Sequence, residues 1–319
     1  MNKKLQILLP LITLISYLSI IFYNQENIIH PNKRALQDYH HEWLNHPAQH
    51  SMSIIKDEEH KDILIVKRDL STKLSKRSQG ILNTLLASGL KKEALHDSGI
   101  ILMFHGKNGR KEDLLPVAER YITAGFTCIL VDLPAHGDSL KTETKYGGKL
   151  GVRALSVAKK YVDMSKQPIY FWGMSLGGRY AISSAQVEKG NFPSPKALIL
   201  VSTFDKLSYV LKEKSTDLFG SFIGKTLYKG LSFSLKFFYN FNPEEIDSCS
   251  IAQNINIPVF MLHGKKDKLI GYKHGENLFN HFPNPDKALH LDENGNHHNI
   301  LVTNYPFYLK SILFLLKHQ

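Results

Sequence analysis

Cysteine is scarce in this chain of 319 residues, which contains only two. No cluster of cysteines and histidines has the spacing of zinc ligands. Cys128 falls inside an apolar stretch, which favours a small buried side chain, although a disulfide with Cys249 stays open. The sequence also lacks internal repeats and long low-complexity tracts. These absences exclude a disulfide-dense scaffold and a repeat protein, and we expect no metal and no cofactor.

Acidic residues are outnumbered, with 29 Asp and Glu against 40 Lys and Arg, for a formal net charge of +11. A nucleic-acid-binding protein would interleave basic with aromatic residues or carry a known binding module, and neither pattern is found. A solvated basic surface explains the charge, and attraction to anionic lipid headgroups is the more specific interpretation. We therefore expect a membrane surface, and no nucleic acid, as a partner. The sequence does not indicate an oligomeric state.

Charged residues are absent from residues 5–23, which consist mostly of Leu and Ile and follow Lys3 and Lys4. About 19 helical residues span roughly 28 Å, close to the hydrocarbon thickness of a bilayer. A signal peptide has a similar basic start but usually a shorter apolar core and a small-residue cleavage site. We therefore expect residues 1–23 to form an uncleaved transmembrane anchor, with the catalytic domain on the extracytoplasmic side. Secretion after signal cleavage is the alternative.

The rest of the chain divides into a polar connector, residues 24–47, and a domain, residues 48–319. Its first elements are predicted to be two antiparallel strands, 51–56 and 62–67, and a helix within 75–95 that is interrupted near Gly89. From Gly99 onward, apolar strands alternate with helices. This alternation predicts an α/β domain with a mostly parallel central sheet and helices on both faces.

Several apolar stretches end in polar motifs. The strand predicted at 99–104 is followed by His105-Gly106, and the one at 126–133 leads to the sequence HGDS at 136–139. The strand at 168–172 leads to GMSLG at 173–177, with a helix predicted at 179–187, and the strand at 257–262 leads to HGKKD at 263–267. A serine between glycines at a turn from strand to helix presents an exposed hydroxyl, because the turn leaves no room for flanking side chains.

The motifs and their order resemble those of the α/β-hydrolase fold from about residue 95 to the C-terminus. This resemblance implies a helical cap insertion, here residues 203–255. The insertion is rich in Leu and aromatic residues, and Gly220, Gly224 and Gly230 separate two weakly amphipathic helices. A cap of this composition would line an apolar pocket suited to an acyl chain. Ordinary packing of the insertion onto the domain explains the same composition.

The resemblance also implies a catalytic triad. Ser175 is the expected nucleophile, Asp267 the acid that orients the base, and His297 the favoured base, with His298 as the alternative. The order serine, acid, histidine is that of the family. Asp132 precedes the serine and is expected to brace the loop around His136. Asp138 and Asp292 are less favoured acids.

The backbone N–H groups of Lys107 and Leu176 are expected to form the oxyanion hole, by the same resemblance. Lys107 stands where a small or apolar residue is usual, which leaves open a contact between its side chain and an anionic substrate. Ala135 replaces a usual glycine, a departure expected to affect loop conformation only.

These residues predict a serine hydrolase of the esterase or lipase type that cleaves carboxylic esters through an acyl-enzyme intermediate. Lipid or acylglycerol-type esters are the preferred substrates, because an apolar insertion accompanies an apolar N-terminus. A peptidase or an acyltransferase could use the same triad, since a fold does not determine the reaction. A catalytically silent, membrane-tethered binding protein is the alternative from another class.

Overall fold

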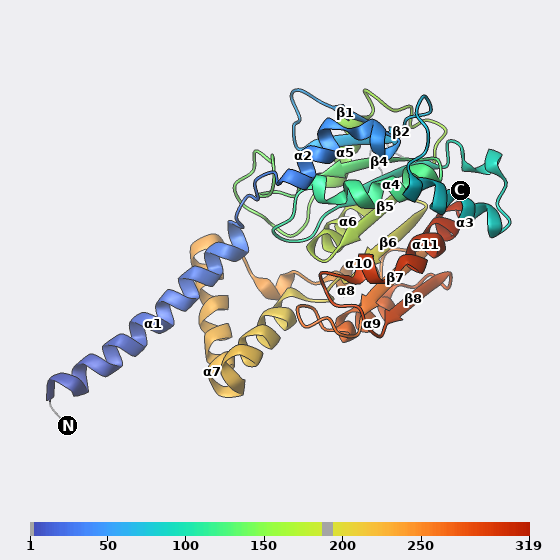
Figure 1. The fold of residues 1–319 in the computed structure, drawn as a ribbon. Helices are drawn as coiled ribbons and strands as arrows, with labels where there is room; N and C mark the ends of the chain where they lie inside the picture. The colour runs from blue at the N-terminus through green and yellow to red at the C-terminus, as the bar shows by residue number, and fades with distance from the viewer. Residues whose placement is uncertain (1–2, 187–193) are drawn as a thin grey trace.

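One eight-stranded sheet organises the molecule (Figure 1). The computed structural model describes residues 3–186 and 194–319. The strand order is β1-β2-β4-β3-β5-β6-β7-β8, in which β1, β2 and β4 pair antiparallel and the remaining neighbours pair parallel. The strands are β1 Met52–Lys56, β2 Ile63–Arg68, β3 Gly99–Phe104, β4 Phe126–Val131, β5 Ile169–Met174, β6 Ala197–Val201, β7 Val259–Gly264 and β8 Lys287–Asp292.

Helices cover both faces of the sheet, and successive side chains of each buried strand point to opposite faces. Ile100 and Leu102 of β3 belong to one apolar core, and Ile101 and Met103 belong to the other. The first core includes residues of α5, α6, α8 and α9, and the second includes residues of α3, α4 and α11. These helices are α3 Lys76–Ala87, α4 Leu115–Thr123, α5 Leu150–Ala158, α6 Leu176–Gln186, α8 Ser248–Ala252, α9 Tyr272–His281 and α11 Tyr305–Lys317. The short helices α2 Asp38–Asn45 and α10 Ile300–Thr303 add Trp43 and Ile300 to the second core.

The elements expected before Gly99 are confirmed. β1 and β2 form the predicted antiparallel pair, and α3 ends at Ala87, two residues before Gly89 with its φ of +93°. The expected helix at 179–187 begins earlier, at Leu176, directly after the serine. Its last expected residue, 187, lies outside the described residues. Cys128 and Cys249 are both buried and free, so the two cysteines are not paired.

The insertion after β6 folds mainly into α7, Leu207–Tyr239. Gly220 has a φ of +75°, which breaks the helical path and turns α7 into two helical arms, as Figure 1 shows. Two helices were expected from the glycines of this segment, and the break falls at the first of them. Gly224 and Gly230 instead stay within the second arm.

The N-terminal helix α1, Lys3–Ile29, extends six residues past the expected end of the apolar segment at Tyr23, into the expected connector. It projects from the domain and lies against α7 (Figure 1). Tyr17 donates a hydrogen bond to the Thr226 carbonyl at 3.1 Å, and Ser234 hydrogen-bonds Gln25. Within the part of the chain whose side chains are described, which starts at Pro10, no helix is long and apolar enough to cross a membrane.

Candidate active site

Ser175 lies between β5 and α6, at the end of a strand in the middle of the sheet. Its φ is +56°, a backbone conformation that residues other than glycine rarely adopt. This conformation holds the serine hydroxyl clear of the strand and the helix. A Cβ at Gly173 would collide with the Gly177 carbonyl, and one at Gly177 would collide with the Phe104 carbonyl. Both glycines are therefore required by close packing of the turn against itself and against β3.

The three side chains expected to act together are in hydrogen-bond contact. Ser175 Oγ lies 3.0 Å from His297 Nε2, and His297 Nδ1 lies 2.7 Å from Asp267 Oδ2. All three residues are at most 7% exposed, so few waters compete for these bonds. In this arrangement the serine hydroxyl donates to Nε2, and Nδ1–H donates to the carboxylate.

Asp267 follows β7 and is held from both sides. Its Oδ1 accepts hydrogen bonds from the backbone N–H groups of Leu269 and Ile270, at 2.9 and 2.8 Å. Burial alone would raise the pKa of Asp267, but the hydrogen bond and charge of His297 outweigh it and lower that pKa. The carboxylate therefore stays ionised at neutral pH, which stabilises a protonated His297.

His298, the alternative base, is exposed, and its ring stands at 85° to that of His297 with the centroids 5.7 Å apart. Its backbone N–H binds Asn296, whereas its ring has no contact with Ser175 among the described residues. Of the competing acids, Asp292 accepts hydrogen bonds from the N–H groups of Asn294 and Gly295. It therefore shapes the turn that carries His297.

The loop after β3 (105–109, the oxyanion loop) carries Lys107, one of the two expected oxyanion donors. A Cβ built on Gly106 would lie 3.5 Å from Ser175 Cβ, so this loop runs directly past the nucleophile. Lys107 is the next residue, with an exposed side chain, and Leu176 is the first residue of α6. The first N–H groups of a helix have no partner within it, which leaves that of Leu176 available to an oxyanion.

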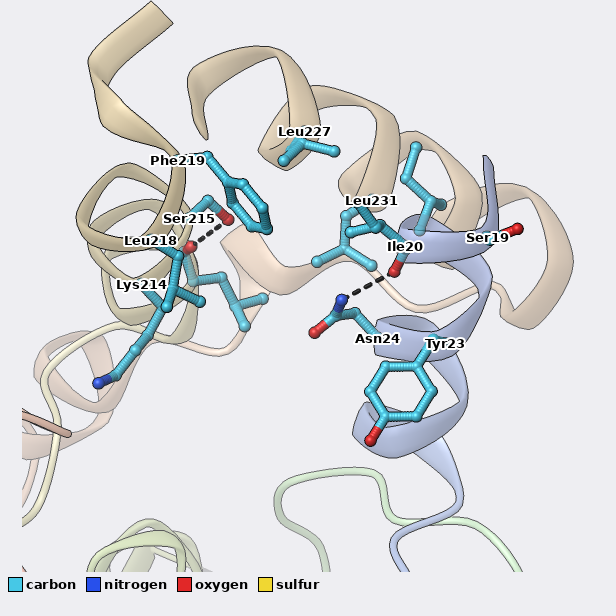
Figure 2. Close-up of a pocket in the computed structure, with 12 residues that line it drawn as sticks. Ser19, Ile20, Tyr23, Asn24, Lys214, Ser215, Leu218, Phe219, Leu227 and Leu231 are labelled. Carbon is cyan, nitrogen blue, oxygen red and sulfur yellow. Dashed lines mark hydrogen bonds between the residues drawn. The ribbon is translucent and has the colours of Figure 1, made fainter. Parts of the chain in front are cut away.

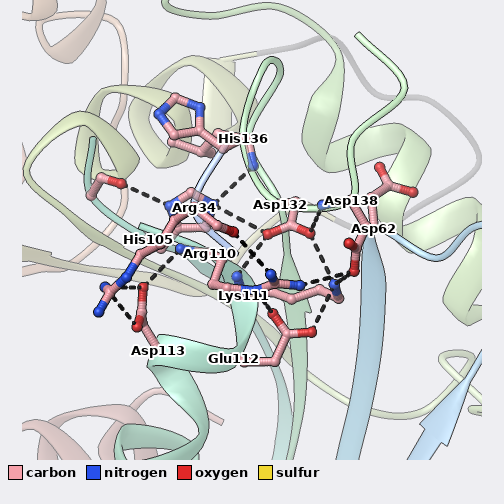
Figure 3. A network of polar contacts seen from close by, with 12 residues as sticks. Arg34, Asp62, His105, Arg110, Lys111, Glu112, Asp113, Asp132, His136 and Asp138 are labelled. Carbon is pink, nitrogen blue, oxygen red and sulfur yellow. Dashed lines mark hydrogen bonds and ion pairs between the residues drawn. The ribbon is translucent and has the colours of Figure 1, made fainter. Parts of the chain in front are cut away.

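A buried network of charges holds this loop, as Figure 3 shows. Asp132 accepts from Lys111 Nζ at 2.9 Å and from the N–H groups of Lys111 and Asp138 at 2.7 and 2.8 Å. Lys111 also pairs with Asp138 and with Glu112, at 2.5 and 2.9 Å. Asp132 thus ties the loops after β3 and β4 together. Its bonds go to Lys111 and Asp138 and not to His136, which donates to the Pro134 carbonyl.

His105 connects the network to the oxyanion loop. Its Nδ1 donates to the Gly106 carbonyl at 2.7 Å, and its Nε2 accepts from the Leu133 N–H at 3.1 Å. This ring therefore supports the loop and does not reach Ser175. Burial lowers the pKa of the neighbouring His136 to about 4, so that ring is neutral at physiological pH. Ala135, in the same loop, has a φ of +66°, the conformation that makes glycine usual there.

The connector before the domain is joined to this network. Asp113, which caps the turn after the oxyanion loop, accepts hydrogen bonds from Tyr39 at 2.7 Å, His40 at 2.8 Å and Arg34 at 3.1 Å. Sequence reasoning missed these positioning residues. The run of four charged residues at 110–113, placed immediately after an oxyanion-loop motif, was the available signal.

A pocket of about 470 Å³ lies between α1 and α7 (Figure 2). Its walls are mostly aliphatic and aromatic, with Ile20 from α1 and Leu218, Phe219, Leu227 and Leu231 from α7. No triad residue lines it. The apolar side chains of the insertion therefore line a pocket, but they do so together with the N-terminal helix.

One group of side chains has donor atoms close enough to share a metal ion. Single donor atoms of Asp57, Glu59 and His60, in the turn between β1 and β2, lie within 4.8 Å of one another. Asp57 already accepts hydrogen bonds from His60 at 3.0 Å and from Tyr161 at 3.0 Å, so its oxygens are engaged. The group is remote in topology from β5 and its serine, at the edge of the sheet.

No protein-family model matches the chain. The uncharacterized protein YfhR of Escherichia coli O157:H7 is 24% identical over 198 residues, which cover 62% of each protein. YfhR of strain K12 is 23% identical over 198 residues with the same coverage. The chain thus matches about 62% of the length of these curated relatives.

Among solved structures, an esterase from Pyrococcus furiosus has a TM-score of 0.60 at 16% identity, covering 91% of this chain and 98% of the esterase. 2,6-Dihydroxy-pseudo-oxynicotine hydrolase has a TM-score of 0.54 at 17% identity, covering 84% of this chain and 67% of that hydrolase. Alpha/beta hydrolase domain-containing protein 10 from mouse has a TM-score of 0.51 at 20% identity, covering 84% of this chain and 98% of the mouse protein. The chain has the α/β-hydrolase fold, so the expected fold class is confirmed.

Proposed function

We propose that this protein is a serine hydrolase that cleaves carboxylic ester bonds. The observation that carries the proposal is the buried hydrogen-bond chain from Ser175 through His297 to Asp267. An isolated serine hydroxyl is a weak nucleophile, and an adjacent base oriented by a carboxylate activates it. We assign the roles of nucleophile, base and orienting acid to these residues in that order.

The reaction follows from this geometry. His297 Nε2 takes the hydroxyl proton as Ser175 Oγ attacks the ester carbonyl, and Asp267 stabilises the imidazolium that forms. The negative oxygen of the tetrahedral intermediate is bound by the N–H groups of Lys107 and Leu176. His297 then donates its proton to the leaving alcohol, and an acyl-enzyme remains on Ser175. Water, deprotonated by His297, attacks that ester and releases the acid.

Lipid or acylglycerol-type esters are the substrates we favour. The apolar pocket between α1 and α7 and the apolar side chains that line it support a hydrophobic acyl group. The Pyrococcus furiosus neighbour is an esterase, which agrees with ester chemistry on this fold. A peptidase or acyltransferase on the same triad, and a silent binding protein, are the alternatives.

We further propose that the protein works at a membrane, with its catalytic domain on the extracytoplasmic side. Apolar side chains that are at least half exposed lie on α1, as in Leu14 and Ile15, and on α7, as in Phe222, Phe233 and Phe237. Large exposed apolar surfaces of this kind are rare in free monomers and common where a protein meets lipid or a partner. The uncharged segment 5–23 includes residues before Pro10, so the membrane-spanning segment we propose is longer than the part of α1 whose side chains are described, and Lys3 and Lys4 would stay on the cytoplasmic side.

Labelling with a fluorophosphonate tests the hydrolase proposal. The wild-type protein should form a stable adduct, and Ser175→Ala should not, because the reagent traps only an activated serine. Wild-type protein that stays unlabelled would instead favour the silent binding protein. Rates on 4-nitrophenyl esters of increasing acyl length then test the substrate class. A maximum at acetate would count against lipid esters.

A further inference from the structure

Arg179 is a buried cation without a partner among the described residues. It lies on α6 and is 6% exposed, and its Nε and Nη1 atoms are buried and donate no hydrogen bond to any of the described residues. No ion pair involves it among the described residues. A guanidinium carries five N–H donors, and leaving them unpaired in the interior is unfavourable unless a ligand accepts them.

The other buried cations of this protein are treated differently. Three Lys or Arg residues are buried in the described part of the chain, namely Arg110, Lys111 and Arg179. Arg110 pairs with Glu112 at 2.6 Å and with Asp138 at 3.1 Å, and Lys111 pairs with three carboxylates. Arg179 is therefore the exception among them.

The position of Arg179 connects it to the candidate active site. It follows Ser175 by four residues, and Ser175 stands directly before the first residue of α6, so the two residues are about one helical turn, or roughly 6 Å, apart. Helical side chains tilt toward the N-terminus of their helix, which is the end that carries Ser175. Its Nη2 lies close to Gly147, 3.8 Å from a Cβ built there. α8, which begins where the cap rejoins the domain, packs against α6.

The nearby carboxylate of Asp247 is already engaged. It accepts the N–H of Ser250 at 3.0 Å as the cap of α8 and lies 3.8 Å from Lys206 Nζ. It attracts Arg179 from beyond ion-pair distance. Burial lowers the pKa of Arg179 to about 10, so the guanidinium still carries its charge at neutral pH.

We infer that Arg179 binds an anionic group, a carboxylate or a phosphate, carried by the ester that Ser175 cleaves. A planar guanidinium with free N–H groups matches the two oxygens of such a group in a bidentate pair. The inference rests on the proposed function and narrows its substrate class to esters whose acyl group carries a negative charge within reach of Arg179.

Two substrates of matched length test the inference: mono(4-nitrophenyl) suberate, which ends in a carboxylate, and 4-nitrophenyl octanoate, which does not. We expect the wild-type kcat/KM for the suberate to exceed that for the octanoate at least tenfold. Arg179→Met should reduce this ratio to one or below, mainly through a higher KM for the suberate. Arg77→Met, which changes a half-exposed arginine on α3, is the matched control and should keep the wild-type ratio.

Thermal unfolding separates a binding residue from a structural one. If Arg179 serves a ligand, Arg179→Met removes an unpaired buried charge, and its Tm should equal or exceed that of the wild type. A lower Tm together with an unchanged substrate ratio overturns the inference. Inorganic phosphate provides the second arm. Phosphate could raise the Tm of the wild type and not of Arg179→Met while the wild-type kcat/KM ratio of suberate to octanoate is one. In that case the ligand is a free anion, and the assignment to the ester is wrong.

The failure of the hydrolase proposal looks different. In that case the wild type hydrolyses neither ester, and the phosphate-dependent Tm of wild type and Arg179→Met alone decides whether the anion site exists. If the octanoate is hydrolysed without any preference for the suberate, and phosphate changes neither Tm, the hydrolase stands and the anion site is overturned.

Discussion

Two adjacent histidines follow β8, and their surroundings differ sharply. His297 is 7% exposed and lies between Ser175 and Asp267, whereas the His298 side chain is exposed to solvent. The turn that precedes both is shaped by Asp292, which accepts two backbone N–H groups. One residue of displacement along this turn therefore decides which imidazole can act as the base.

Substituting each histidine separately tests this difference. His297→Ala should reduce kcat on 4-nitrophenyl butyrate by about 10³-fold or more, because the serine loses its proton acceptor. His298→Ala should stay within about twofold of the wild type. Steady-state rates and circular dichroism on both variants make the comparison. Full activity in both would refute the triad as we assign it.

The site could be predicted from the sequence where its residues directly follow strands. Ser175 and Asp267 end or follow buried strands, and parallel strands bring such positions to one edge of the sheet. The burial of Lys111 and Arg179, and whether each has a charged partner, could not be predicted. Whether a cation has a partner depends on which distant segments pack around it, and periodicity contains no such information.

At the scale of elements, α7 is fastened to the domain by a histidine with a carboxylate at each ring nitrogen. His274 of α9 donates to Asp205 at 2.6 Å and to Glu213 of α7 at 2.9 Å. Burial would lower the pKa of His274, but the two carboxylates outweigh it and raise that pKa. Lys206, Lys212, Lys214 and Lys273 adjoin these three residues in the chain; Lys212 pairs with Glu244, and Lys214 is bound to the Lys268 carbonyl. A charged His274 thus joins the cap to the domain.

This contact predicts a pH dependence of stability. Because the pKa of His274 is higher in the folded than in the unfolded chain, its stabilisation is complete below about pH 6.5 and is lost as pH rises through the folded value. Glu213→Gln should remove about 0.5 kcal/mol of this contribution, a small amount because the Glu213 side chain is 61% exposed.

Urea unfolding of the wild type and of Glu213→Gln at pH 6 and pH 8.5 measures the effect. We expect the two proteins to differ more at pH 6 than at pH 8.5. Asp217→Asn changes an exposed acid on the same arm of α7 and should show no such difference. A constant difference at both pH values would mean that the charge of His274 in the folded state does not change between them.

The packing of α1 against α7 could not be predicted from the sequence. The apolar segment and the apolar insertion were each visible, and the break at Gly220 was expected. The pairing of segments 200 residues apart was not, since Tyr17 meets Thr226 only in the folded chain. Apolar composition predicts that a surface will be buried, but it does not name the surface that covers it.

For the molecule as a whole, the exposed apolar side chains of α1 and α7 predict binding to lipid. Phe222→Ser and Phe237→Ser together should reduce the fraction of protein that co-sediments with phosphatidylcholine–phosphatidylglycerol vesicles about fivefold or more. The two rings are 86% and 70% exposed, so the folded domain should not lose stability. Leu140→Ser, which changes a 90% exposed leucine on the domain, is the control and should bind like the wild type. Equal binding of all three proteins would contradict a lipid-facing role for α7.

Because both native thiols are buried, the cap can be labelled at a single introduced cysteine for spectroscopy. Cys128 and Cys249 are 0% and 9% exposed, and burial raises the pKa of both, so neither thiol is available as a reactive thiolate in the folded protein. A maleimide dye would therefore attach only to an introduced cysteine, such as Phe233→Cys on the second arm of α7. The native background thus permits fluorescence or spin-label measurements of cap motion without first removing any cysteine.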